Sequence, residues 1–362
     1  MSVYNHGINN RSADCYMNSI FQCLMATEDF ITYFDTITQP NDNLIVLISK
    51  LIKDFQKENH SIINCDVLKQ YIQKLNNTYF VGIQNDSQEF LIFLLNKLHE
   101  LLKKQIDFVI KDSDQDELRY IKLEKKYEEN KENNIIKKYI IDFKSRHYVD
   151  YAFYEFKKFK KFLYSKDYSE IQNIFGTIIS SEIKCSNCGN INITLNSELI
   201  INIQLQKEFK TLYDCLDSYT GKEQLSKDNL YKCEFCNKLS NACKNLTIYK
   251  PPKNIIITFK RFKYDNRTEK INIPIECPMI LDISSYCHTS LVQKSSKYKL
   301  YAINYHMGTP TGGHYISDCK NFTDKKWYNC NDSSIMLNTE LNNIELENIK
   351  TNAYIVFYKK YK

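Results

Sequence analysis

The sequence is poor in glycine and proline, with 8 and 6 residues of each among 362, and it has one tryptophan. It contains no run of about 18 apolar residues, the length needed for a membrane-spanning helix, so we expect no membrane span. Residues 1–10 are polar and lack the apolar core of a secretory signal. Hydrophobic residues make up 43% of the chain, which is enough for a sizeable core. We therefore expect a folded protein, and a monomer.

The chain also lacks a concentrated block of positive charge. Its formal net charge is +6 at pH 7, but the lysines are spread along the sequence and mixed with acidic residues. Residues 157–161 come closest to the basic cluster, interleaved with aromatics, that is typical of a nucleic-acid surface. A solvated helix face explains them better, so we expect no nucleic-acid partner.

Cysteine is plentiful, with 13 residues, an odd number. Without a secretory signal a disulfide framework is not expected, so we expect a cytoplasmic or nuclear protein with reduced thiols. Reduced cysteines can pack in the core, bind a metal or act in catalysis.

Hydrophobic spacing divides the chain into a helical part and a strand-rich part. Helical periodicity predicts helices over residues 15–26, 44–55, 67–75 and 90–102, and Asp86 with Glu89 resembles a capping box before the last of these. Residues 105–147 are dense in charged and amide side chains, so we interpret them as an insertion that is exposed helix, partly disordered, or both. From about residue 176, β-branched and aromatic runs predict strands over residues 191–205, 255–262, 299–305, 315–319 and 353–358. This order indicates an α+β fold.

Cys15 lies where a polar loop meets the start of an apolar-periodic helix. A helix N-terminus stabilises negative charge, and the thiolate is the nucleophilic form of cysteine. Most cysteines in a reduced protein are structural, so Cys15 needs supporting context. A thiol protease also requires a base and an oxyanion hole, and the amide of Asn10 could reach a developing oxyanion beside the Cys15 N–H. Asn10 could equally be a turn residue.

His314 is the best candidate for the base. It follows Gly312 and Gly313, in the richest glycine cluster of the chain, and precedes a predicted strand beginning at Tyr315. A third group should hold the imidazole in its useful tautomer. Asn331 and Asp332 could supply it, although an Asn-Asp pair alone is simply a turn signal. The order Cys, His, Asn also occurs in papain-like proteases.

Two Cys-x-x-Cys pairs predict a metal site. Four thiolates match a structural, tetrahedral zinc with no open coordination position, which would make zinc a structural cofactor only. The ligands would be Cys185, Cys188, Cys233 and Cys236.

Together these motifs resemble the ubiquitin-specific protease family of cysteine deubiquitinases, over nearly the whole chain. Residues 7–22 resemble its cysteine box, 84–90 its glutamine–acid box, 252–262 the strand motif after its fingers, and 306–315 and 327–335 its histidine box. The resemblance implies a hand-like, papain-like fold in one catalytic domain. The helical thumb would span about residues 1–175 with the charged insertion, the zinc-ribbon fingers about 176–250, and the β-rich palm about 251–362.

The resemblance also implies hydrolysis of peptide or isopeptide bonds after the C-terminal Gly-Gly of ubiquitin, with ubiquitin and ubiquitinated proteins as partners. Cys15 matches the nucleophile, His314 the general base, Asn331 the third member, Asn10 the oxyanion donor and Asp332 a supporting acid. Substrate-binding positions are matched by Asp86, Gln88, Glu89 and Tyr315. Helix capping would explain Asp86 and Glu89 without ubiquitin.

Some residues depart from the family pattern. Ser12 replaces a glycine in the loop before the nucleophile, Asp14 puts a negative charge next to the thiol, and Cys330 stands where an aromatic is usual. Three alternative functions stay open: a protease for a ubiquitin-like modifier, a catalytically inactive ubiquitin-binding scaffold, and a zinc-ribbon nucleic-acid binder.

Overall fold

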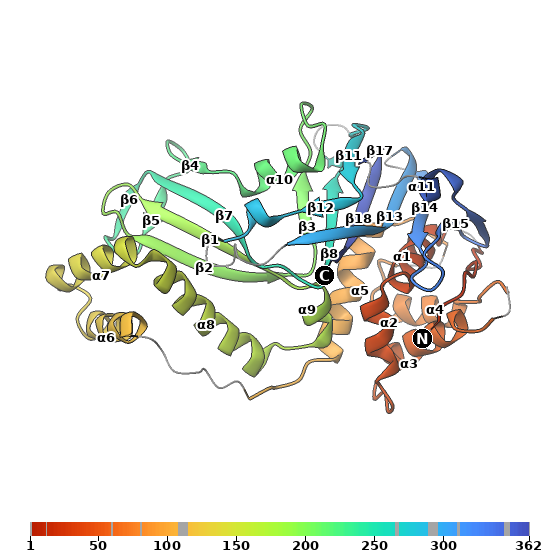
Figure 1. Ribbon diagram of the computed structural model, residues 1–362, viewed down its shortest axis with the longest axis horizontal. Helices are drawn as coiled ribbons and strands as arrows, with labels where there is room; N and C mark the ends of the chain where they lie inside the picture. Colours follow the sequence, from red (N-terminus) through yellow and green to blue (C-terminus); the bar gives the residue numbers. More distant parts are fainter. Residues whose placement is uncertain are drawn as a thin grey trace.

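The computed structural model describes residues 2–11, 13–58, 61–79, 82–107, 115–264, 268–288, 296–309, 312–343 and 348–361. The molecule is elongated, with the N-terminal helices and the C-terminal strands at one end and a second sheet with its own helices at the other (Figure 1). None of the helices in these ranges is both long and apolar enough to cross a membrane. Ser12 lies outside the described residues, so its predicted effect on the loop stays a prediction.

Five helices form the N-terminal part: four lie where the periodicity predicts them, and α2 was not predicted. Every residue of α1 is buried, because this helix packs between α5 and strand β14. Asp42 caps α3 and Asp86 caps α5 by accepting hydrogen bonds from backbone N–H groups of the first turn, which confirms the predicted cap at Asp86. The bounds are α1 Cys15–Met25, α2 Glu28–Asp35, α3 Asn43–Phe55, α4 Asp66–Leu75 and α5 Ser87–Leu101.

The charged insertion is largely helical where it is described, and it is less exposed than its composition suggests. Tyr120, Ile140 and Phe143 are buried against Ile193 and Tyr249 of the neighbouring sheet. A sparse apolar face is therefore enough to dock these helices, although most of their other positions are charged. The bounds are α6 Gln115–Glu129, α7 Asn134–Arg146, α8 Tyr148–Lys166 and α9 Glu170–Phe175.

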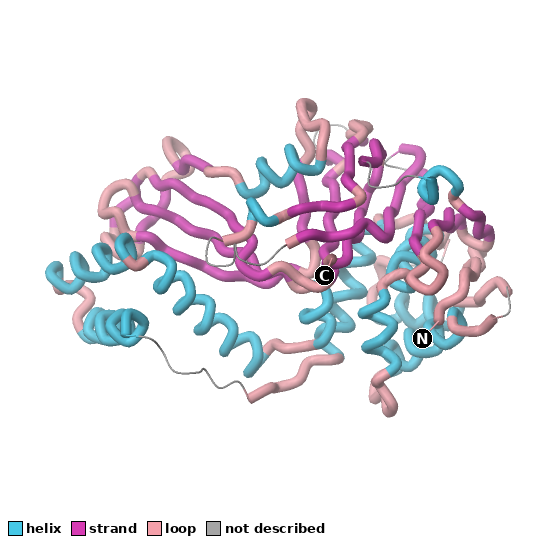
Figure 2. The backbone as a smooth tube through the Cα atoms, viewed as in Figure 1, coloured by secondary structure: helices cyan, strands magenta, loops and turns pink. Residues whose placement is uncertain are grey.

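These helices cover a four-stranded antiparallel sheet of order β2-β1-β7-β4 (Figure 2). Residues 191–205, predicted as one strand, form two strands in different sheets, because the chain breaks after Glu198 and β3 pairs elsewhere. A short hairpin of β5 and β6 lies at the far end. The bounds are β1 Thr177–Cys185, β2 Ile191–Glu198, β4 Glu223–Leu225, β5 Tyr231–Cys233, β6 Lys238–Ser240, β7 Ala242–Lys250 and helix α10 Leu212–Thr220.

The central sheet has eight strands, in the order β16-β15-β14-β13-β18-β8-β3 with β12 added beside β13. Ile256 and Ile355 face the core of the N-terminal helices, while Ile257 and Val356 face a second core on the opposite side. Burial on both faces explains why β8 and β18 read as continuous apolar runs. The bounds are β3 Ile201–Gln204, β8 Asn254–Lys260, β12 Ile280–Asp282, β13 Lys297–Thr309, β14 Gly312–Lys320, β15 Trp327–Asn331, β16 Ser334–Leu337 and β18 Ala353–Lys360.

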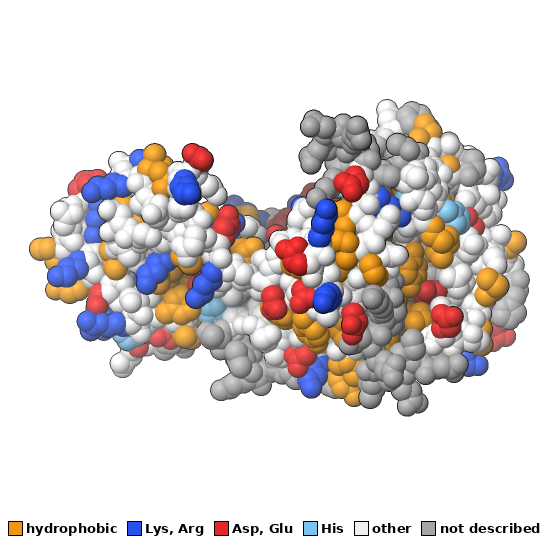
Figure 3. All heavy atoms as spheres, turned by 90° about the horizontal axis from the view of Figure 1, so that it is seen from above, with side chains coloured by type: hydrophobic (Ala, Val, Ile, Leu, Met, Phe, Trp, Pro, Cys, Tyr) orange, Lys and Arg blue, Asp and Glu red, His pale blue; other side chains and the backbone are white. Residues whose placement is uncertain are grey.

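Smaller elements complete the fold, and together with the helices and sheets above they confirm the predicted α+β class. They are β9 Phe262–Tyr264, β10 Thr268–Lys270, β11 Ile275–Pro278, β17 Asn348–Thr351, helix α11 Thr339–Asn343 and the 3-10 helix Ser284–Tyr286. In the face shown in Figure 3, side chains of both charge signs lie among apolar ones rather than in a single basic block.

Candidate active site

The fold brings the helix that begins with Cys15 against the strand that carries His314. Cys15 is the first residue of α1, and this helix packs against β14, the strand that carries His314. The backbone of Tyr315, the residue after His314, hydrogen-bonds the Cys15 thiol. The two segments therefore meet at the first turn of α1, as catalysis by a thiol and an imidazole requires.

The thiol of Cys15 is only 3% exposed. Burial raises the pKa of Cys15 above its ordinary value of 9.0, the hydrogen bond from the Tyr315 backbone lowers it, and the nearby charge of Asp332 raises it again. The helix N-terminus alone therefore does not hold a thiolate here, and a proton acceptor is needed to generate one.

His314 is oriented by a side chain of the next strand. Its Nε2 lies 2.7 Å from Oδ1 of Asn331, which ends β15. When this amide oxygen accepts, the imidazole carries its proton on Nε2 and leaves Nδ1 as the basic atom. The His314 side chain is 36% exposed, so a substrate can approach it.

Asp332 connects the nucleophile loop to this strand. Its carboxylate accepts hydrogen bonds from Nδ2 of Asn10 at 2.8 Å and from Nδ2 of Asn18 at 2.7 Å, and lies 3.9 Å from Nε2 of His314. Its carbonyl also accepts from the Ile8 N–H at 2.8 Å. Asp332 has a φ of +49°, a left-handed conformation that Asp tolerates better than most residues. It thus orients Asn10 and lies near the imidazole.

The predicted substrate-binding residues lie at the start of α5 and on β14. Both carboxylate oxygens of Asp86 are used within the protein, one by the Gln88 and Glu89 N–H groups and the other by the hydroxyl of Tyr354. The side chain of Gln88 donates to Asn202 at 2.7 Å. Glu89 is exposed at the first turn of α5 and, unlike Asp86, could meet a basic ligand. The geometry of Asp86 fits the helix-capping explanation.

The four predicted metal ligands converge. Their sulfur atoms all lie within 4.8 Å of one another, and Cys188 and Cys233 are 3.8 Å apart. Four sulfurs at about 2.3 Å from a tetrahedral zinc are about 3.8 Å apart, so the residues present fit such an ion. Cys185 ends β1 and Cys233 ends β5, so the two loops after these strands bring the two Cys-x-x-Cys pairs together.

Comparison with known proteins decides the family, because the model for the family described as ubiquitin carboxyl-terminal hydrolase matches residues 6–358. The chain belongs to the ubiquitin carboxyl-terminal hydrolase family. This confirms the resemblance drawn from the sequence motifs.

Relatives in this family match the chain over its length. Ubiquitin carboxyl-terminal hydrolase Usp2 of Drosophila melanogaster is 25% identical over 98% of this chain and 34% of that protein. Ubiquitin carboxyl-terminal hydrolase 8 of Saccharomyces cerevisiae is 27% identical over 97% of this chain and 70% of that protein. The chain spans less than half the length of the first relatives that it matches.

The fold is also that of solved structures. A chain of the SAGA DUB module Ubp8/Sgf11/Sus1/Sgf73 bound to monoubiquitin matches with a TM-score of 0.68 and 23% identity, over 99% of this chain and 69% of that one. The same module bound to ubiquitin aldehyde matches with a TM-score of 0.67 and 24% identity, over 99% and 70%.

Three residues around this hydrolase-family site were missed by the sequence analysis. Asn18 donates to Asp332, but its polar side chain gave no distinct signal, because Ser19 and Gln22 on the same buried helix are also polar. The side chain of Gln84 pairs with both backbone groups of Gly313, next to His314, at 2.9 and 3.1 Å. Lys69 is buried beside the nucleophile loop, and nothing in its local sequence indicates it.

The effect predicted for Asp14 needs correction. Its carboxylate is not an isolated negative charge, because Nζ of Lys69 lies 3.4 Å away and both side chains are 1% exposed. Cys330 is buried in the core between the central sheet and α1, so the unusual residue there packs rather than contacts solvent.

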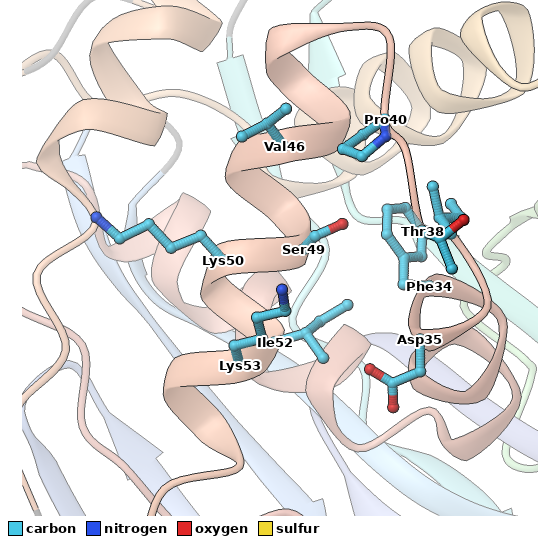
Figure 4. A pocket seen from close by; sticks show the side chains of 10 residues that line it. Phe34, Asp35, Thr38, Pro40, Val46, Ser49, Lys50, Ile52 and Lys53 are labelled. Atoms are coloured by element: carbon cyan, nitrogen blue, oxygen red, sulfur yellow. The ribbon is translucent and has the colours of Figure 1, made fainter.

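A separate cavity of about 490 Å³ lies between α2 and α3 (Figure 4). Phe34, Pro40 and Val46 form part of its wall, and Lys50 and Lys53 lie at its edge. None of the predicted site residues lines it, so it takes no part in the arrangement around Cys15.

Proposed function

We propose that this chain is a thiol-dependent deubiquitinase that hydrolyses peptide or isopeptide bonds after the C-terminal Gly-Gly of ubiquitin. The observation that carries the proposal is the pairing of His314 with Asn331 on strands packed against the helix that begins with Cys15. Family membership and the ubiquitin complexes named for the similar structures support ubiquitin as the substrate.

In the proposed reaction His314 accepts the proton of the Cys15 thiol while the sulfur attacks the carbonyl carbon of the terminal glycine. The tetrahedral oxyanion is stabilised by the Cys15 N–H and by the amide of Asn10, whose orientation Asp332 fixes. The imidazolium then protonates the departing amine, and water hydrolyses the thioester with His314 as base, which regenerates the thiol. Asn331 keeps the imidazole in the required tautomer throughout.

Recognition of the ubiquitin tail is proposed to involve the start of α5. Glu89 is the exposed acid there and can meet a basic residue, while Asp86 fixes the helix start on which Glu89 lies. Gln88 lines the approach in this proposal, and Tyr315, which is only 6% exposed, contributes through its backbone next to His314. The contact between Gln84 and Gly313 narrows the path to His314, and glycines suit a narrow path because they have no side chains.

We also propose that the four-cysteine group binds one structural zinc ion. Cys185, Cys188, Cys233 and Cys236 would all be ligands, so the metal supplies stability and no chemistry. Metal analysis of the purified protein should find about one zinc per chain, consistent with a single Cys₄ site. A folded protein without zinc would exclude this role. The division into thumb, fingers and palm, the monomeric state and the cytoplasmic or nuclear location stay predictions.

Hydrolysis of a ubiquitin–fluorophore conjugate tests the function. The wild-type chain should release the fluorophore, and Cys15→Ala should abolish release because no nucleophile is left. A Cys15→Ala protein that still cleaves the conjugate would refute the assignment. A panel of ubiquitin-like modifier conjugates measured in parallel would show whether another modifier is preferred.

The burial of Cys15 favours one second candidate, a catalytically inactive ubiquitin-binding scaffold. A thiol that is 3% exposed and has a raised pKa reacts slowly unless substrate binding opens the site. Tight ubiquitin binding by a wild-type protein that releases no fluorophore would favour the scaffold.

A further inference from the structure

A buried ion pair lies directly before the nucleophile. Asp14 precedes Cys15 at the start of α1, and Lys69 lies on the buried side of α4. Nζ of Lys69 is 3.4 Å from Oδ2 of Asp14, and each side chain is 1% exposed. Burying two charges costs free energy that the pair recovers only with good geometry and further hydrogen bonds, so such a pair suggests a specific role.

The pair joins three separate segments. Lys69 donates to the carbonyl of Asn9 at 2.9 Å, and Oδ1 of Asp14 accepts from the Gly82 N–H at 3.3 Å. The N–H of Asp14 in turn donates to Oδ1 of Asn10 at 3.2 Å. Asn9, Asn10 and Asp14 are thereby tied to α4 and to the segment that leads into α5. They include the proposed oxyanion donor, Asn10, and the residue before the proposed nucleophile.

The charges also bear on the chemistry. A lone buried carboxylate one residue from a thiol would oppose formation of the thiolate. Lys69 balances that charge, and the charge on Asp332, not that on Asp14, is among the main influences on Cys15. The negative residue before the nucleophile is therefore tolerated because α4 supplies a buried cation.

We propose that Lys69 is a positioning residue for the nucleophile: paired with Asp14, it fixes the loop that places Asn10 and Cys15 and neutralises the charge beside the thiol. The expected change in kcat rests on the deubiquitinase function proposed above. The expected change in the alkylation rate of Cys15 can be measured without ubiquitin.

Three variants test the proposal: Lys69→Met, the neutral pair Asp14→Asn/Lys69→Met, and Lys74→Met as the matched control. Lys74 lies on the same helix but is exposed. The measurements are kcat and KM for the ubiquitin–fluorophore conjugate, with active sites titrated, and the rate of Cys15 alkylation by iodoacetamide in the free protein, followed by mass spectrometry.

Lys69→Met should lower kcat at least about tenfold with KM nearly unchanged, since a small displacement of reacting groups lowers the rate steeply. Alkylation of Cys15 should slow in the same direction. The neutral double variant should regain much of this loss, to within about fivefold of wild type, because no buried charge is left unpaired. A residual loss is expected because the hydrogen bond from Lys69 to the Asn9 carbonyl is missing. Lys74→Met should match wild type. A purely structural Lys69 would reduce the number of titratable sites and leave kcat per site unchanged.

Two results would overturn the proposal: a folded Lys69→Met protein with wild-type kcat and alkylation, or equal impairment of the single and double variants. If Lys69→Met does not fold, the double variant decides. Alkylation within about fivefold of wild type in the folded double variant supports the pairing, and a larger loss or failure to fold contradicts it. If wild type does not cleave the conjugate while alkylation follows the expected order, the proposed function fails and the pairing stands.

Discussion

Gly312 and Gly313 precede His314 but differ in the space around them. A Cβ on Gly313 would lie 2.2 Å from Nε2 of His306 and 2.3 Å from the Met307 carbonyl oxygen, distances that no packing tolerates. A Cβ on Gly312 would meet only Oε1 of Gln84, at 3.8 Å. Close packing therefore requires glycine at position 313 but not at position 312.

This difference gives a matched pair of variants. Gly313→Ala should lower kcat/KM at least about tenfold, because the strand carrying His314 must shift, and a displacement of about 1 Å can cost about 100-fold. Gly312→Ala should stay within about twofold of wild type, since its Cβ meets ordinary van der Waals space. Steady-state hydrolysis of the ubiquitin–fluorophore conjugate measures both. Equal effects of the two variants would contradict the packing account.

The environment of Cys15 predicts a pH dependence. Because burial raises its pKa above 9.0, less thiolate is present at neutral pH than for an ordinary thiol. The rate of iodoacetamide alkylation at Cys15 in the free protein should therefore keep rising with pH beyond 9.0, the ordinary thiol value. A plateau reached below pH 7 would show a preformed thiolate–imidazolium pair and contradict this reading.

The motif residues could be predicted from the sequence, and their buried partners could not. Cys15, His314 and Asn331 stand in motifs with characteristic spacing. Lys69 and Asn18 act through contacts between segments far apart in the chain, and a single sequence gives no register for such contacts. Asp14 is an example. The sequence predicted that its charge would disfavour the Cys15 thiolate, but the fold places the opposite charge of Lys69 beside it.

Among the elements, α6 and α7 differ most from expectation. Their charge density predicts an exposed insertion, but Tyr120 is 3% exposed and contacts the rings of Phe143 and Tyr151. Tyr127 stacks on Phe235, which lies between the metal-ligand candidates Cys233 and Cys236, with ring centroids 5.1 Å apart. The insertion therefore supports the four-stranded sheet and the loop that carries Cys233 and Cys236.

Removing a buried ring should reveal this support. Tyr120→Ala should lower the free energy of unfolding by about 3 kcal/mol, the usual cost of removing a buried aromatic side chain. Tyr139→Ala, on α7 and 59% exposed, is the control and should change it by less than about 0.5 kcal/mol. Urea unfolding monitored by circular dichroism measures both. A Tyr120→Ala protein as stable as the control would mean that α6 is only loosely docked.

The spacing of apolar residues predicted most elements correctly, because the side of each element that faces the core carries apolar residues at regular intervals. The helices at α1, α3, α4 and α5 and the strands at β8, β13, β14 and β18 lie where it places them. The break between β2 and β3 was missed because apolar residues continue across it while the chain passes from one sheet to another. Local patterns specify strand propensity but not sheet membership.

At the scale of the whole molecule, the account depends on the meeting of the two ends of the chain. The N-terminal loop is tied to the β15–β16 turn by the Ile8 N–H to the Asp332 carbonyl and by Asn10 to the Asp332 side chain. Gly7 fits against Ser333 so closely that a Cβ there would lie 2.2 Å from its carbonyl oxygen. Only the family resemblance predicted that the two ends meet. Residue patterns within either segment do not indicate which distant segment it contacts.

Labelling with a ubiquitin suicide probe tests the central claim most directly. The wild-type protein should form one covalent adduct with the probe, and mass spectrometry should map it to Cys15, because Cys15 begins the helix that packs against the strand carrying His314 and is the proposed nucleophile. Cys15→Ala should form no adduct although 12 other cysteines remain of the 13 in the sequence. An adduct on a different cysteine, or none on a wild-type protein that binds ubiquitin, would contradict the account.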